Sequence, residues 1–159
     1  MPRHAHVGAI LSAFLTALLL MSPSAHARTS TAAEIARAWG LLGNWGTDCS
    51  KPASPQNPRL SYRSERDGTI VHFRDFKTRR DSLKVLSLSQ TPGGMLELVI
   101  DFPALKHQRK LTVTKGADGR IRAYANVELG SGKFSVQDGV MLHTGKMTEW
   151  QSRCELLSA

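Results

Sequence analysis

From residue 59 onward, apolar and polar positions alternate with a period of two, which is typical of half-buried β-strands. Leu96, Leu98 and Ile100, for example, fall on one side of the alternation, and Glu97 and Asp101 on the other. Turn sequences rich in Gly, Asp and Pro separate these runs at steps of about ten residues. Together with a first strand before Cys49, the pattern predicts about eight or nine short strands. The runs are 60–63, 69–76, 82–90, 96–102, 110–114, 120–127, 134–136 and 148–154.

The fold class expected from this pattern is all-β. Short connections make neighbours in sequence neighbours in the sheet, so we expect an antiparallel up-and-down meander. A meander of this length can close on itself and so remove its free edges. The sequence therefore predicts one small β-barrel domain.

A short amphipathic helix is predicted over residues 31–42, before the first strand. Thr31 and Glu34 have the spacing of a capping box, and Gly40 is a stop signal. A helix this short needs a partner surface, so we expect it to cover an open end of the barrel or an edge of the sheet. The apolar residues that recur at helical spacing are Ile35, Trp39 and Leu42.

Residues 1–27 have the layout of a secretory signal peptide. An apolar run over residues 7–21 is short for a membrane span, and Ala25-His26-Ala27 supplies a small-x-small cleavage pattern. We expect cleavage after Ala27 and a single mature domain, 28–159, that is periplasmic or secreted. An uncleaved membrane anchor is the alternative. No second apolar span follows, so we do not expect an integral membrane protein.

Cys49 and Cys154 are the only cysteines of the chain. In an exported protein such a pair predicts a disulfide bond. A redox thiol or a metal ligand is the alternative, but the sequence has no Cys-x-x-Cys motif, and the nearest mature-chain histidine to Cys154 is His143. We expect the bond to join the first and last strands where the sheet closes.

A short helix, a Gly-x-Trp sequence at the first strand and a meander after it resemble the lipocalin-like superfamily. The motif here is Gly43-Asn44-Trp45. The resemblance implies a basic residue late in the chain that packs over this tryptophan at the closed barrel end, and Arg153 is the candidate. The helix that lipocalins usually pack after the last strand has no counterpart in this sequence, so we expect a smaller or partly open barrel.

The two cysteine regions also resemble those of small exported alphaproteobacterial proteins of uncharacterised function. The matching sequences are Trp45-x-x-Asp48-Cys49-Ser50-Lys51-Pro52 and Thr148-x-Trp150-x-x-Arg153-Cys154. This resemblance supports the fold and the compartment and implies no activity. Trp45 and Trp150 are expected to pack over the disulfide as a structural barrel end. A ligand-stacking pair is the alternative.

The sequence contains no common catalytic motif: no Gly-x-Ser-x-Gly elbow, phosphate loop, dinucleotide fingerprint or His-Glu-x-x-His. His72, His107 and His143 are too far apart in sequence for a local metal site. We therefore expect no enzymatic activity, no metal and no cofactor. For His72, in the middle of a strand, a structural role is expected.

The leading hypothesis is a binding module that holds a small apolar or amphipathic molecule inside the barrel. In a barrel this small, the candidate side chains serve equally well as packed core, and this alternative stays open. The Pro-rich stretch 50–58 is expected to be a loop over the open end, or alternatively a spacer. The candidate ligand-binding residues are Leu96, Leu98, Ile100, Leu111, Val113 and Tyr124.

The formal net charge is +8, or +7 without residues 1–27, whose only Lys, Arg, Asp or Glu is Arg3. This charge favours acidic partners, so the second hypothesis is a surface that docks on acidic envelope polymers or inhibits an exported hydrolase. Solvated faces are the alternative. Specific nucleic-acid binding is not expected, because few aromatic residues accompany the charge. The candidate anion-binding residues are Arg79, Arg80, Arg109 and Lys110.

Overall fold

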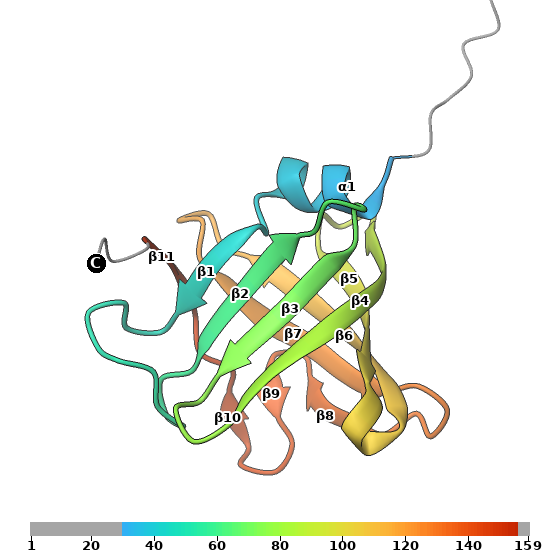
Figure 1. Cartoon of the computed structure of the whole chain (residues 1–159). Helices are drawn as coiled ribbons and strands as arrows, with labels where there is room; N and C mark the ends of the chain where they lie inside the picture. The colour runs from blue at the N-terminus through green and yellow to red at the C-terminus, as the bar shows by residue number, and fades with distance from the viewer. Residues whose placement is uncertain (1–29, 156–159) are drawn as a thin grey trace, which may run out of the picture.

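The computed structural model describes residues 30–155 as one helix and eleven β-strands (Figure 1). The predicted signal peptide lies outside these residues. In chain order the elements are α1 (Ala32–Trp39), β1 (Gly43–Gly46), β2 (Arg59–Ser64), β3 (Ile70–Asp75), β4 (Arg80–Gln90), β5 (Leu96–Phe102), the 3-10 turn η1 (Pro103–Leu105), β6 (His107–Lys115), β7 (Ile121–Glu128), β8 (Phe134–Gln137), β9 (Val140–Met141), β10 (Lys146–Met147) and β11 (Ser152–Cys154).

All the strands belong to one antiparallel sheet with the order β10-β9-β8-β7-β6-β5-β4-β3-β2-β1-β11. The predicted antiparallel meander is therefore confirmed, with more strands than expected. The extra strands arise after β8, because turns at Gly139 and Gly145, both with positive φ, divide the chain into strands of two to four residues.

Strand ladders do not close the sheet into a barrel, because its order begins at β10 and ends at β11. A single isolated bridge joins Ile121 of β7 to Gln151, just before β11, through hydrogen bonds of 3.0 and 2.8 Å. Thr148 is near β7 but is not part of a strand ladder. Its hydroxyl donates a hydrogen bond to the Ala123 carbonyl, and its backbone amide donates one to the Gly139 carbonyl. We refer to this line between β7 and residues 148–151 as the seam.

Helix α1 covers one end of the sheet (Figure 1) and begins with the predicted capping box of Thr31 and Glu34. It ends at Gly40, whose φ of 84° suits glycine. The helix buries Ala33, Ala36 and Trp39, so its buried face is rotated from the predicted apolar stripe. The Trp39 indole N–H donates to the Gly94 carbonyl at 2.7 Å, which ties the helix to the turn after β4.

The Cys49–Cys154 disulfide is present and joins the chain after β1 to the end of β11. Beside it, Trp45 is 3% exposed, and its indole N–H donates to the Leu41 carbonyl. The Arg153 guanidinium lies 5.3 Å from the centre of the Trp45 ring and donates to the carbonyls of Gly40 and Leu42. This end of the sheet is thus fixed by a covalent bond and by an arginine that joins β11 to the end of α1.

Trp150 lies elsewhere. Its ring contacts the guanidinium groups of Arg122 and Arg120, at 4.6 and 5.8 Å, and it packs beside Gly116 in the β6–β7 turn. The ring contacts found for Trp150 are thus with arginines and a turn glycine of β6 and β7, and not with the disulfide.

Candidate ligand-binding cavity

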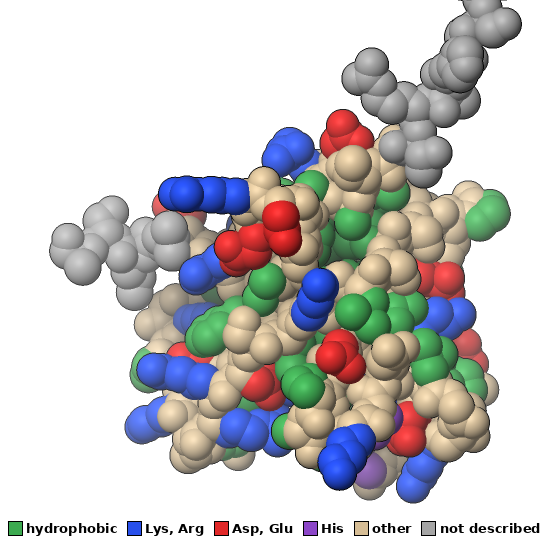
Figure 2. Space-filling model, turned by 45° about the vertical axis from the view of Figure 1, so that its right-hand side comes forward, with side chains coloured by type: hydrophobic (Ala, Val, Ile, Leu, Met, Phe, Trp, Pro, Cys, Tyr) green, Lys and Arg blue, Asp and Glu red, His purple; other side chains and the backbone are tan. Residues whose placement is uncertain are grey.

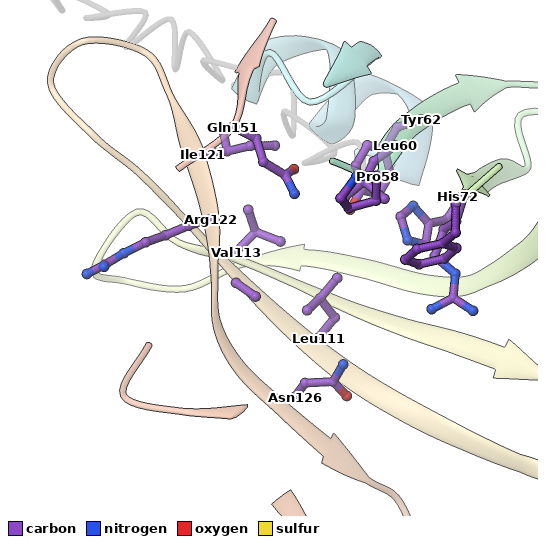
Figure 3. Close-up of a pocket in the computed structure, with 13 residues that line it drawn as sticks. Pro58, Leu60, Tyr62, His72, Leu111, Val113, Ile121, Arg122, Asn126 and Gln151 are labelled. Atoms are coloured by element: carbon purple, nitrogen blue, oxygen red, sulfur yellow. The ribbon is translucent and has the colours of Figure 1, made fainter. Parts of the chain in front are cut away.

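A cavity of about 230 Å³ lies on the inner face of the sheet, between β2–β3 and β6–β7 (Figure 3). Most of its lining is aliphatic or aromatic, with a few polar side chains among them, as is usual for small-molecule sites. The lining residues are Pro58, Leu60, Tyr62, His72, Arg74, Phe76, Leu111, Val113, Ile121, Arg122, Ala123, Asn126 and Gln151.

On one side of the cavity, strand register brings His72 and Tyr62 together, because directly opposed residues of an antiparallel pair share a face. Their rings stack with centroids 4.5 Å apart and planes 19° apart, and the residues are only 4% and 2% exposed. Figure 3 shows the His72 ring directed toward the cavity. The pair therefore forms a rigid aromatic wall with polar atoms at its surface.

Burial, with a smaller contribution from the charge of Arg74, lowers the pKa of His72 to about 3. The imidazole is therefore neutral near pH 7. Its Nδ1 atom is buried and has no hydrogen-bond partner among the described residues. A buried nitrogen without a partner costs about 1–3 kcal/mol. Burial likewise raises the pKa of Tyr62, which stays protonated.

Arg74 lines the cavity next to His72, and its charge is balanced. Its Nε and Nη2 atoms donate to the two carboxylate oxygens of Asp81, opposite it on β4, at 2.7 and 2.6 Å. Burial of Asp81 is the largest single influence and opposes its ionisation, but the hydrogen bonds from Arg74 and the positive charges of Arg74 and Arg79 together outweigh burial and hold the carboxyl pKa below its ordinary value. The pair thus presents a polar, electrically neutral surface.

On the opposite side, β7 departs from regular alternation. Val113 pairs with Ala123, while the preceding residue Thr112 pairs with Ala125, so Tyr124 is the extra residue of a β-bulge. The bulge reverses which side chains face inward beyond it. Tyr124 does not line the cavity, and a hydrogen bond to the Asp138 carboxylate raises the pKa of its hydroxyl.

Asn126, beyond the bulge, faces the cavity and is held by Arg109. The Arg109 Nε donates to Asn126 Oδ1 at 2.7 Å, and its Nη2 donates to Ser135 Oγ at 2.9 Å. Because the oxygen of the Asn126 amide is occupied, its nitrogen remains on the cavity side (Figure 3). Gln151, on the seam, also directs its amide toward the cavity (Figure 3).

A second hollow of about 430 Å³ adjoins the first and shares Pro58, Ala123 and Gln151 with it. Its lining includes Pro55 and Gln56, so the predicted loop does border the interior. The loop is held by the side chain of Asn57, which bonds to Thr47, Asp48, Lys51 and Pro52. The interior thus continues past the Ile121–Gln151 bridge and along the seam.

The structure divides the predicted ligand-binding residues into three groups, and Tyr124, which does not line the cavity, is one of them. Leu111 and Val113 line the cavity. Leu96, Leu98 and Ile100 are 0 to 2% exposed and belong to the packed core beside it. Most of the other lining residues, among them Tyr62, Arg74, Asn126 and Gln151, did not figure among the sequence-based candidates. Inward alternation on residues 60–74 was a usable signal for the first two, whereas nothing in the sequence marks the bulge that exposes Asn126 to the cavity.

The predicted anion-binding residues do not form one surface. Arg79 and Arg80 lie in the β3–β4 turn region, Lys110 is on the outer face of β6, and Arg109 points inward. Each has a carboxylate within 4 Å, in the pairs Arg79–Asp81, Arg80–Asp75, Arg109–Glu128 and Lys110–Glu97. On the face drawn in Figure 2, basic and acidic side chains are interspersed.

Among residues 30–155, no cluster of three or more His, Cys, Asp or Glu side chains is arranged as metal ligands. No helix in that same part of the chain is long and apolar enough to cross a membrane. The chain matches no protein-family model, no curated protein and no solved structure.

Proposed function

We propose that this protein is an exported binding module of lipocalin-like architecture that holds a small amphipathic molecule on the inner face of its sheet. The observation that carries the proposal is the 230 Å³ cavity, in which a mostly apolar wall surrounds the neutral imidazole of His72. Pockets for drug-sized ligands usually begin at about 300 Å³, so the ligand is small.

The lipocalin-like part of the proposal is supported by the contacts of the Gly-x-Trp sequence. Arg153 covers Trp45, which is the packing that the resemblance implied, and it also bonds to the carbonyls of Gly40 and Leu42. A Cβ on Gly43 would lie 3.4 Å from the Arg153 guanidinium carbon, so the arginine packs closely over this glycine. The disulfide and the leader-like residues 1–27 support a periplasmic or secreted location.

Docking on acidic polymers has less support, because each of the four candidate cations already has a carboxylate neighbour. Such pairs weaken the field available to an external anion. The binding-module hypothesis therefore stands ahead of the surface hypothesis.

The test is to block the cavity. Ala123 lines both hollows, and Ala125, on the same strand, faces the other way because of the bulge. The oxidised protein would be incubated with a small-molecule extract of its source cells and examined by native mass spectrometry. We expect a bound molecule on the wild type and on Ala125→Leu but none on Ala123→Leu. A bound molecule that persists on Ala123→Leu, or its absence from the wild type, would reject the proposal.

A further inference from the structure

No unbalanced charge of the described residues points into the cavity. Its two lining cations are Arg74, paired with Asp81, and Arg122. Figure 3 shows Arg122 pointing away from the cavity, where its guanidinium lies 4.6 Å from the centre of the Trp150 ring. A charged ligand would lose its hydration without gaining an opposite charge, and this loss is costly in a buried site.

The cavity nevertheless offers hydrogen bonds from several directions. His72 and Tyr62 supply an imidazole nitrogen and a hydroxyl on one wall. Across from them, Asn126 presents its amide nitrogen, which Arg109 holds in place. Gln151 adds a second amide near the bridge. A ligand without polar groups would leave these buried atoms unpaired, which is unfavourable.

The size and the apolar wall complete the description of the ligand. A volume of about 230 Å³ corresponds to about eight water molecules at ~30 Å³ each, which is the scale of one substituted ring. Leu111 and Val113 provide the apolar surface against which such a ring would pack.

Building on the proposed function, we infer that the ligand is an uncharged, single-ring molecule whose hydroxyl or amide group hydrogen-bonds His72 and Asn126. Its apolar part packs on Leu111 and Val113. The three features that select it are charge neutrality, a group that both donates and accepts hydrogen bonds, and small size.

Four probes of nearly equal size separate these features: benzyl alcohol, benzylamine, benzoate and ethylbenzene. Each would be titrated at pH 7.5 into the oxidised protein, and the dissociation constant measured from amide NMR shifts of cavity-lining residues. We expect benzyl alcohol to bind about tenfold or more tightly than the charged probes, and several-fold more tightly than ethylbenzene. Benzoate or benzylamine binding as tightly as benzyl alcohol would overturn the inference.

A matched pair of variants tests the contribution of His72. His72→Phe keeps a stacked ring and removes both nitrogens, whereas Tyr124→Phe removes a hydroxyl outside the cavity. We expect His72→Phe to abolish the preference for benzyl alcohol over ethylbenzene and Tyr124→Phe to preserve it. A preference that survives His72→Phe overturns the assigned hydrogen bond. Should His72→Phe misfold by circular dichroism, the probe ranking on the wild type still decides the inference.

The same measurements can reject the proposed function independently of the inferred ligand class. If Ala123→Leu leaves the binding of all four probes unchanged, or if no probe shifts the cavity resonances, the cavity is not a binding site. If the probes bind, Ala123→Leu blocks them and the ranking differs from that expected, the binding module stands and only the ligand class is wrong.

Discussion

At the scale of single residues, His72 links the cavity to the pH dependence of folding. In the folded protein its pKa is about 3, whereas an unfolded histidine titrates near its ordinary value of 6.5. Below pH 6.5 the unfolded state therefore binds a proton that the folded state excludes. The free energy of unfolding should fall as the pH falls, by up to about 1.4 kcal/mol per pH unit until the folded pKa is reached.

Urea unfolding at pH 7 and pH 5 would measure this loss, and His72→Phe is the control because it removes the titrating group. Besides Arg74, Asp81 is the charged group that acts on the imidazole, and its lowered pKa keeps it ionised over this range. We expect the wild type to lose about 2 kcal/mol more than the variant between the two pH values. Equal losses would show that His72 titrates normally in the folded protein.

Arg153 is the second residue with a measurable role, because its guanidinium donates to two carbonyls and covers the Trp45 ring. Arg153→Gln should lower the free energy of unfolding by about 1–2 kcal/mol. Arg63→Gln is a matched control: Arg63 also lies over an aromatic ring, Phe73, but within residues 30–155 its side chain bonds only to Ser61 on its own strand. Thermal unfolding would compare the two, and equal shifts would contradict the role of Arg153.

At the scale of elements, α1 is part of the core and not an appendage. Trp39 is 6% exposed, bonds to Gly94 and lies 4.3 Å under the Lys115 ammonium group, which also bonds to its carbonyl. Trp39→Ala should destabilise the protein by about 3–5 kcal/mol. Trp150→Ala, at a partly exposed ring between arginines, should cost about 1 kcal/mol. Denaturant midpoints that do not separate these variants would show that α1 is dispensable.

The strands and turns were largely predictable, and the bulge in β7 was not. The alternation identifies the strands because it reflects one buried and one solvent-exposed face. The Asp-Gly pairs identify the hairpin turns between them. The alternation over residues 120–127 is equally compatible with an unbroken strand, which would place Asn126 on the polar outer face. Only the pairing with β6 shows where the register shifts. Asn126 could not be assigned to the cavity for this reason.

At the scale of the whole molecule, composition and cysteine count predicted one disulfide-linked domain. They could not predict which Lys and Arg side chains would form ion pairs with carboxylates. Lys110 and Glu97 lie on different strands and meet only through the sheet register. The same holds for Arg74 and Asp81 across β3 and β4. The net charge of +8 therefore overstated the basic surface, since several cations are neutralised locally.

The disulfide should contribute the largest single term to global stability. It joins residues 105 apart in sequence, and the chain-entropy model assigns about 4–5 kcal/mol to a loop of this length. The double variant Cys49→Ser/Cys154→Ser should lose this amount in urea unfolding, and the wild type under reducing conditions should match the variant. A loss below about 1 kcal/mol would mean that the unfolded chain is already constrained.

Because Cys49 and Cys154 are bonded, the backbone from β2 to β11 is a covalent ring, and α1 with β1 is a tail attached to it. A single proteolytic cut in any hairpin of the ring leaves one connected molecule. A cut between α1 and Cys49 instead releases the helix and exposes the core beneath it. The protein should therefore tolerate a proteolytic cut within the ring better than a cut in the short segment between α1 and Cys49.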